Sequence, residues 1–275
     1  MFFLVDAFTD APFLGNPAGV YLMTKDILSY KTEDLQRMAT YFDWSEISYI
    51  SRISENKYRI RWFSPRDEAP LCGHATLAAA HILFHTGHVT GNRVDFVFND
   101  GIIQTTKETD SINNGFISML FPIKPIKKAQ DIPFDPKEII GISEYEDILK
   151  DDLVYVIILK DSNCVRRVKP NSKAIKKINA RAIIVTARGP NKHNCEYDFC
   201  SRYFAPSVGL YEDPVCGSAH CRLTPYWAQI LNKTEMLAFQ ASERTGILKV
   251  GLCGDYVRIS GRAVITAEFL SLWRH

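Results

Sequence analysis

The chain has 275 residues, of which 46% are hydrophobic and 23% charged, a composition typical of a globular protein with a substantial core. Lysine and arginine number 33 against 31 aspartates and glutamates, so the positive excess typical of nucleic-acid-binding proteins is lacking. The longest apolar runs, such as residues 153–159, have the length of a strand, so we expect no membrane-spanning helix.

Nothing at the N-terminus is typical of a signal peptide, because residues 1–13 carry Asp6 within an apolar stretch and lack a cleavage site. Seven cysteines are an odd number and too few for a secreted disulfide scaffold, so we expect a cytoplasmic protein. The chain has no phosphate-binding loop or dinucleotide motif, and His81, His85 and His88 lack a nearby acidic ligand. We therefore predict no cofactor, no metal and no nucleic-acid or membrane partner.

In chain order, nine segments alternate apolar and polar residues and are bounded by turn signals, as strands do. They are 58–63, 93–98, 101–106 and 115–120 in the first half, and 181–187, 198–204, 246–252, 255–260 and 263–270 in the second. The sequence therefore predicts a strand-rich protein.

Residues 75–84 predict a helix that is apolar on nearly every side, since only Thr76 and His81 are polar. Such a helix has to be buried all round, and a sheet curled around it achieves this burial. A second helix is expected after Cys216, where Pro225 should kink it or mark its first turn.

Residues 61–83 and 202–231 resemble each other. Both contain R-[WY]-F-[SA]-P, a turn-rich loop, and then P-[LV]-C-G-[HS]-A at the start of a helical run. The order of the motifs is kept, although the second loop is three residues longer. This internal duplication predicts two structurally equivalent halves.

We place the N-terminal lobe at 1–120, with a C-terminal strand near 264–275 as its expected completion, and the C-terminal lobe at 121–263. The junction is 121–136, where four prolines in sixteen residues are typical of a linker. Two lobes that face each other create a cleft, where we expect the active site.

Cys72 and Cys216 each precede a glycine at the start of a helical run. The first amides of a helix lack intrahelical partners and its dipole is positive there, so a thiolate or a bound carboxylate is favoured and the cysteine pKa is expected to fall. If the halves face each other, both thiols reach one pocket that suits proton removal from a carbon acid.

Three titratable residues lie near these motifs or at a strand start. His74 is two residues after Cys72, Asp213 is three before Cys216, and Glu46 begins an apolar alternation. From spacing alone, a solvated carboxylate at Glu46 and a structural histidine at His74 remain the ordinary interpretations.

Five stretches together resemble the phenazine-biosynthesis PhzF-like family, whose relatives include diaminopimelate epimerase and proline racemase. They are "VDAFTDAPFLGNPAGV", "SEISYI", "APLCGHATLAAA", "SRYFAPSVGLYEDPVCGSAHC" and "DYVRISGRAVITAEF". The resemblance implies an α+β fold of two pseudo-symmetric lobes, each a mostly antiparallel β-barrel around a central helix. It also implies a homodimer, a small carboxylate-bearing substrate, and an isomerase that transfers a proton without metal or organic cofactor.

The resemblance places the family's catalytic glutamate, histidine and aspartate at Glu46, His74 and Asp213. The positions that hold the substrate carboxylate in the family correspond to Ser45, Gly73, Gly217 and Ser218. In the phenazine enzyme the glutamate shuttles a proton along the substrate ring. Such a shuttle needs a pKa raised toward neutrality, which burial of Glu46 is expected to provide.

Cys72 and Cys216 stand where the epimerases carry their catalytic thiol pair, so a second hypothesis is a two-thiol epimerase or racemase. A third hypothesis, of another class, is a catalytically idle ligand-binding or scaffold protein. We favour Glu46 as the acid and base, because His74 and Asp213 accompany it. The substrate and the pathway stay open, since a family fold does not fix them.

Overall fold

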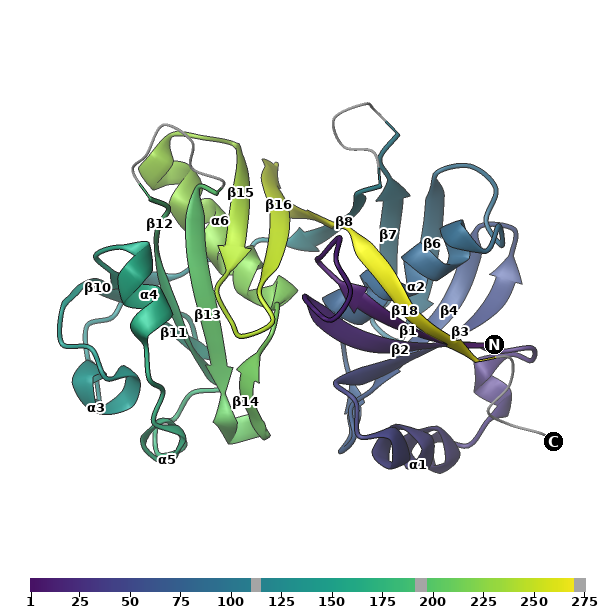
Figure 1. Cartoon of the computed structure of the whole chain (residues 1–275), viewed down its shortest axis with the longest axis horizontal. Helices are drawn as coiled ribbons and strands as arrows, with labels where there is room; N and C mark the ends of the chain where they lie inside the picture. The colour runs from purple at the N-terminus through teal and green to yellow at the C-terminus, as the bar shows by residue number, and fades with distance from the viewer. Residues whose placement is uncertain (110–114, 191–196, 270–275) are drawn as a thin grey trace. The chain divides into compact units, whose positions relative to one another are not determined.

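The computed structural model describes residues 1–109, 115–190 and 197–269, and the chain divides into two compact units (Figure 1). Unit 1 comprises Met1–Leu120 and the chain from Arg258 onward, and unit 2 comprises Phe121–Val257. Residues 258–263, which the sequence analysis assigned to the C-terminal lobe, thus belong to unit 1. No helix among the described residues is long and apolar enough to cross a membrane.

The first half of the chain contains eight strands, two α-helices and a 3-10 turn among its described residues. They are β1 (Phe2–Ala7), β2 (Asn16–Leu22), η1 (Ile27–Ser29), α1 (Thr32–Phe42), β3 (Glu46–Ser54), β4 (Lys57–Phe63), β5 (Glu68–Ala69), α2 (Gly73–His85), β6 (Arg93–Phe98), β7 (Gly101–Lys107) and β8 (Ile117–Pro122).

The second half continues with the following elements. They are β9 (Lys127–Lys128), α3 (Pro136–Ile140), β10 (Tyr145–Lys150), β11 (Val154–Leu159), α4 (Ser162–Arg167), α5 (Ser172–Ile175), β12 (Ala182–Arg188), β13 (Phe199–Ala205), η2 (Pro206–Val208), β14 (Leu210–Asp213), α6 (Gly217–Leu231), β15 (Glu235–Gln240), β16 (Gly246–Cys253), β17 (Tyr256–Gly261) and β18 (Ala263–Phe269). All nine segments predicted as strands from their alternation contain a strand; residue 270 of the last lies outside the described residues.

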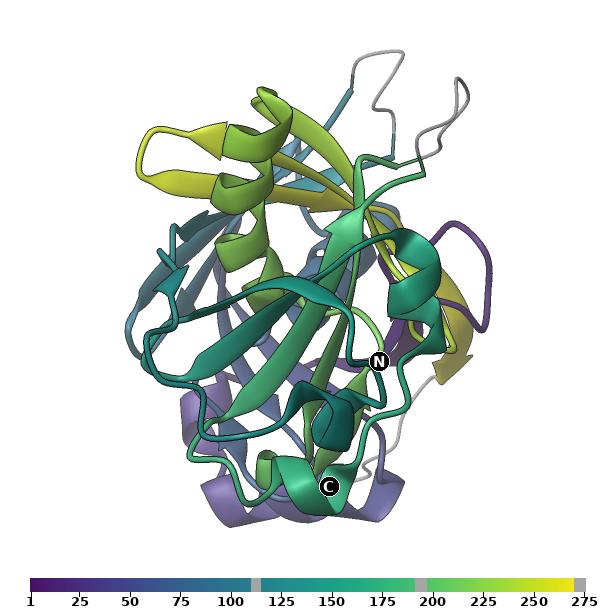
Figure 2. The ribbon, with the colours of Figure 1, turned by 90° about the vertical axis from the view of Figure 1, so that its left-hand side faces the viewer.

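The two units repeat one scheme of strand pairing. In unit 1, β1 runs antiparallel to β2, β2 parallel to β3, β3 antiparallel to β4, and β4 pairs with both β5 and the parallel strand β6. In unit 2, β10, β11, β12, β13, β14 and β15 pair in the same senses. The teal and green strands of unit 2 run side by side in both views (Figure 1, Figure 2).

The first strand of each scheme has a further antiparallel neighbour, β18 beside β1 and β9 beside β10. The fold is therefore mixed α/β, rich in strands and poor in helices. Closure of each sheet into a barrel stays a prediction.

Helix α2 is the centre of unit 1. It packs against β18, β1, β2, β3 and β7, and its residues from His74 to Ala80 are buried, as are Ile82 and Leu83. The helix ends at Thr86, and Gly87 follows with φ +70°, a left-handed conformation that glycine adopts without strain. The predicted helix is confirmed, and its run 75–84 is buried except at the half-buried His81 and Phe84.

Helix α6 of unit 2 continues through Pro225. A proline has no amide hydrogen, so the carbonyl four residues earlier, that of Cys221, loses its helical donor. The backbone N–H of Lys124 donates to this carbonyl at 3.0 Å instead. Pro225 therefore lies inside the helix and not in its first turn, and another segment of unit 2 satisfies the freed acceptor.

The chain enters β3 through a fixed aromatic turn. Asp43 ends α1 in a left-handed conformation, and Trp44 then stacks on Phe42 and Phe2, with ring centroids 4.7 and 5.4 Å apart. Offset-stacked rings of this kind resist displacement. The turn therefore fixes the backbone directly before Glu46.

Candidate active site

Cys72 is the N-cap of α2 and provides the first acceptor of the helix. Its carbonyl accepts from the backbone N–H of Thr76 at 3.1 Å and from the Thr76 hydroxyl at 2.6 Å. The amides of Gly73, His74 and Ala75 precede this first helical bond, so they have no acceptor within the helix. The end of α2 is therefore suited to an anionic group.

Glu46 reaches this helix end because β3 lies along α2. The hydroxyl of Ser48 on β3 donates to the carbonyl of Ala75 at 2.9 Å. Glu46 Oε2 then lies 3.1 Å from His74 Nε2, and the hydroxyl of Ser45 donates to the same oxygen at 2.6 Å. Three residues that the resemblance assigned to the site thus meet at one carboxylate oxygen.

Glu46 and His74 form an ion pair in which His74 is buried and Glu46 half-buried, with side chains 8% and 22% exposed. Burial alone raises the pKa of Glu46, but the His74 charge and the hydrogen bonds from His74 and Ser45 bring it below its ordinary value. For His74 burial lowers the pKa, and the neighbouring Cys72 and Glu46 raise it well above 6.5. The expectation of a raised Glu46 pKa is wrong for this structure, because the His74 charge and the two hydrogen bonds together outweigh desolvation, although burial is the largest single effect.

The Cys72 thiol also lies against the His74 ring. Its Sγ is 3.4 Å from Nδ1 and 4.0 Å from Nε2. Burial raises the pKa of Cys72 more than the His74 charge lowers it, and the Glu46 carboxylate raises it further. The expected fall in the Cys72 pKa at the helix end is therefore overturned by desolvation.

The start of α6 in unit 2 has the same local arrangement. Cys216 is the N-cap, and its Sγ lies 3.3 Å from the hydroxyl of Ser218, the counterpart of His74. His220 Nδ1 donates to the Cys216 carbonyl at 2.8 Å, as Thr76 does for Cys72. Burial lowers the pKa of His220 to about 4, so its ring is neutral and keeps a proton for this bond. Gly217 is the first residue of the helix, like Gly73 in α2.

Asp213 is the last residue of β14 and pairs with Tyr203. The buried side chain of Gln240 holds the loop behind it: its Nε2 donates to the carbonyl of Asp213 at 2.6 Å, and its Oε1 accepts from the N–H of Cys216 at 2.8 Å. Burial and the charge of Asp213 raise the pKa of Cys216 well above its ordinary value. Cys216 is thus a thiol at neutral pH.

The predicted site residues fall into two groups. Ser45, Glu46, Cys72 and His74 with Gly73 are in unit 1, and Asp213, Cys216, Gly217 and Ser218 are in unit 2. Within unit 1 the structure joins glutamate, histidine and thiol directly. That both groups act on one substrate stays a prediction.

One set of side chains has the donors of a metal site. The ligand atoms of Glu46, Cys72 and His74 lie within 4.8 Å of one another. Oxygen, nitrogen and sulfur donors of this kind can hold zinc. The sequence prediction of no metal stays a prediction.

The sequence analysis missed two residues that hold the site. Asn16 is buried at the start of β2, and the Ser45 hydroxyl lies 3.4 Å from its Oδ1. Gln240 connects Asp213 and Cys216. Asn16 stands in a stretch quoted for the resemblance, but the position of Gln240 at the end of β15 gives no local signal.

A model of the family described as phenazine biosynthesis-like protein matches residues 5–268. An uncharacterized isomerase of Pseudomonas aeruginosa is 39% identical over 270 residues, which cover 97% of this chain and 96% of that protein. A crystal structure of a PhzF-family protein of Enterococcus faecalis superposes with a TM-score of 0.87 at 32% identity and covers 97% and 96% of the two chains.

A predicted epimerase of Pseudomonas aeruginosa, whose structure is solved, is similar with a TM-score of 0.72 at 18% identity, over 98% of this chain and 99% of that one. At this identity the likeness concerns the fold alone. The fold of the chain is thus also that of an epimerase-like protein.

Proposed function

Because the chain belongs to the phenazine biosynthesis-like family, we propose that it is an isomerase that moves a proton between carbon atoms of a small carboxylate-bearing substrate. Glu46 is the proposed acid and base. One observation carries this choice: Glu46 Oε2 lies 3.1 Å from His74 Nε2, beside the N-terminus of a buried helix.

In the proposed reaction the Glu46 carboxylate accepts a proton from a carbon atom of the substrate, and the electron pair of that C–H bond moves into a conjugated system. Glu46 then returns the proton to a different carbon atom. A double bond changes place, and neither an oxidant nor a reductant is consumed. With its lowered pKa, Glu46 is in the base form at neutral pH before the substrate binds, as this order requires, but it is a weaker base than the shuttle with a raised pKa that the resemblance implies.

His74 has a supporting role in this proposal. As an imidazolium it donates from Nε2 to Glu46 and stabilises the carboxylate between turnovers. Its positive charge also favours the negative charge that develops on the substrate after the proton leaves.

We propose that the substrate carboxylate is held by the first amides of α2, at Gly73, and by the corresponding groups of α6, at Gly217 and Ser218, with Asp213 beside them. Helix N-termini favour anions through free N–H groups and the helix dipole. The Ser45 hydroxyl, which donates to Glu46, supplies a further polar contact. Both units then serve one substrate, and the chain works as a homodimer without cofactor.

The two-thiol hypothesis is less well supported. A thiol pair that exchanges a proton needs one thiolate, and burial raises the pKa of both Cys72 and Cys216. An idle binding or scaffold protein would not need the ion pair of Glu46 and His74 at a helix end. We therefore keep Glu46 as the proton carrier.

The proposal is tested by hydrogen exchange with solvent. The protein is incubated in deuterated water with unsaturated cyclic carboxylic acids, amino acids and hydroxy acids, and deuterium at carbon is followed by NMR. We expect exchange in at least one unsaturated acid. The Glu46→Gln variant should lose it by about 10²- to 10⁴-fold, the usual contribution of an acid–base group. Undiminished exchange by that variant would refute the proposal.

A further inference from the structure

The segments that lead into α2 and α6 are each held by an arginine–glutamate pair. Arg61 on β4 donates from Nε and Nη2 to the two carboxylate oxygens of Glu68 on β5, both at 2.7 Å. Arg202 on β13 makes the same two bonds to Glu212 on β14, at 2.7 and 2.8 Å. Parallel double bonds of this kind fix both planar groups in one orientation.

The two pairs occupy equivalent places in the repeated scheme. The Arg61 guanidinium lies over the ring of Phe63 with 5.0 Å to its centroid, and that of Arg202 over Phe204 with 4.9 Å. Each glutamate stands four residues before an N-cap cysteine, a spacing that the two halves share. The duplication thus preserves a whole arrangement of guanidinium, carboxylate and ring.

Each arginine also contacts the helix that crosses between parallel strands. Arg61 Nη2 donates to the hydroxyl of Thr32, the first residue of α1, at 2.8 Å. Arg202 Nη1 donates to the carbonyl of Val168, directly after α4, at 2.9 Å. Each guanidinium therefore joins a crossover helix, a central strand and the segment before a site cysteine.

The two segments differ in what else supports them. In unit 2, Gln240 binds the backbone of Asp213 and Cys216, and the Ser242 hydroxyl donates to the Pro214 carbonyl at 2.7 Å. Gln240 pairs with Ser201, the residue before Arg202. The segment before Cys216 thus has side-chain support that does not involve the arginine.

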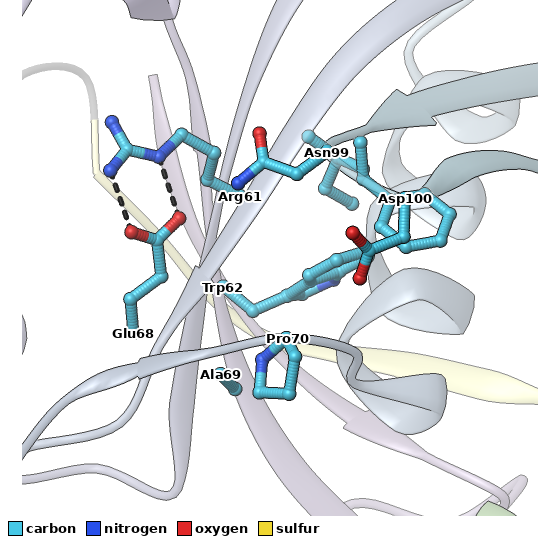
Figure 3. Close-up of a pocket in the computed structure, with 9 residues that line it drawn as sticks. Arg61, Trp62, Glu68, Ala69, Pro70, Asn99 and Asp100 are labelled. Carbon is cyan, nitrogen blue, oxygen red and sulfur yellow. Dashed lines mark hydrogen bonds and ion pairs between the residues drawn. The ribbon is translucent and has the colours of Figure 1, made fainter.

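In unit 1, extending the β4–β6 register by one residue beyond Arg59 and Val97 puts Phe98 at the position that Gln240 has in unit 2, and both residues end their strands. A phenyl ring cannot bind backbone groups as an amide does. Phe98 instead lines a pocket of about 260 Å³ with Ala69 and Pro70, and the Arg61–Glu68 pair lies at one side of it (Figure 3). The segment before Cys72 thus borders open space.

We propose that Arg61 and Glu68 are positioning residues that hold the segment carrying Cys72 and His74, and that the first half of the site depends on this pair more than the second depends on Arg202 and Glu212. This inference rests on the proposed function, because the position of the segment matters only if Cys72 and His74 belong to an active site. The predicted effect on thiol access can be measured without any turnover.

The experiment measures the rates at which iodoacetamide alkylates Cys72 and Cys216 in the folded protein, each followed on its own peptide by mass spectrometry. Both thiols are buried, so alkylation reports local opening of the chain. We expect Arg61→Gln and Glu68→Gln each to speed alkylation of Cys72 by about fivefold, the upper range for one partly exposed ion pair. Cys216 should stay within about twofold of its original rate.

Three further variants separate positioning from general stability. Arg202→Gln should speed the alkylation of Cys216 less than Arg61→Gln speeds the alkylation of Cys72, because Gln240 still holds the segment before Cys216. Arg61→Lys keeps the positive charge but loses the two parallel hydrogen bonds of the guanidinium. Cys72 should therefore be alkylated more slowly in this variant than in Arg61→Gln. Arg93→Gln breaks the Arg93–Asp95 pair, whose arginine is 52% exposed, and should leave both rates unchanged.

The double variant Arg61→Gln, Glu68→Gln should react no faster at Cys72 than either single variant, since both remove one interaction. Equal acceleration at Cys72 and Cys216 would show a general loss of stability and overturn the proposal. An unchanged alkylation rate of Cys72 in Glu68→Gln would also overturn the proposal. This test remains valid even if Arg61→Gln does not fold. If the thiol rates behave as expected while Glu46→Gln keeps full exchange activity, the proposed function fails and the positioning of the segment stands.

Discussion

Glu46, the first residue of β3, and His74, in the first turn of α2, form a largely buried ion pair with 3.1 Å between Oε2 and Nε2. The pair gives the site a carboxylate and an imidazolium at the same pH, because each raises the stability of the other's charged form. An acid–base group and its positive partner thus lie at the end of a helix that favours anions.

The titration of His74 tests this pair directly. We expect NMR to give a His74 pKa above 6.5, and a lower pKa in Glu46→Gln, because burial then acts against a smaller opposing charge. His81 and His220, both with a pKa of about 4, serve as controls whose titration should not respond to the substitution. An unchanged His74 pKa in the variant would contradict the ion pair.

The ion pair also predicts a pH window for stability. Because the pKa of Glu46 is lowered in the folded state, its contribution to the free energy of unfolding is complete above pH 4.5. This contribution is lost as the pH falls through the folded-state pKa. Because the pKa of His74 is raised in the folded state, its contribution to the free energy of unfolding is complete below pH 6.5. This contribution is lost as the pH rises through the folded-state pKa. Urea unfolding should therefore show the largest difference between the original chain and Glu46→Gln between pH 4.5 and 6.5.

A second ion pair, between a buried arginine and a half-buried aspartate, lies in unit 2. Arg222 on α6 is 3% exposed and lies 2.6 Å from the carboxylate of Asp151. Removal of the partner leaves a buried guanidinium without its counter-charge, so we expect Asp151→Ala to cost about 3–5 kcal/mol of unfolding free energy. The exposed pair of Arg93 and Asp95 provides the control, and Asp95→Ala should change stability by about 0.5 kcal/mol or less. A cost for Asp151→Ala no greater than that of the control would contradict the burial argument.

The turn before Asn16 requires a glycine. Gly15 has φ +65°, and a Cβ there would lie 2.2 Å from the backbone oxygen of Ala7. Gly254 has φ +59° with nothing within 4 Å of such a Cβ. Gly254→Ala should therefore lower the free energy of unfolding by about 1 kcal/mol, from its backbone conformation alone. Gly15→Ala should lower it clearly more, with both values measured by urea unfolding. Equal costs at the two positions would mean that the turn relaxes around the methyl group.

The alternation of the sequence predicted the strands, and the apolar run 75–84 predicted a buried helix, because both depend on periodicity along the chain. The repeated Cys-Gly motif predicted equivalent helix starts. The repeat contained a further signal that we did not use: Glu68 and Glu212 each stand two residues before the proline of the second motif, and each pairs with the arginine of the first.

The meeting of Glu46 with His74 followed only from the family resemblance, since no spacing rule links the start of β3 to the first turn of α2. The pKa directions could not be predicted either. Whether burial or the neighbouring groups prevail depends on contacts of about 3 Å. At Glu46 the neighbouring charge and hydrogen bonds together lower the pKa, whereas at Cys72 burial raises it.

The most direct test of Glu46 as the proton carrier compares three variants in one exchange experiment. Deuterium incorporation from solvent is measured for an unsaturated acid that the original chain exchanges, with Glu46→Gln, Cys72→Ser and Cys216→Ser under the same conditions. We predict a loss of about 10²- to 10⁴-fold for Glu46→Gln and far smaller losses for the two serine variants. Full exchange by Glu46→Gln together with a comparable loss in both serine variants would contradict this role and favour the thiol pair.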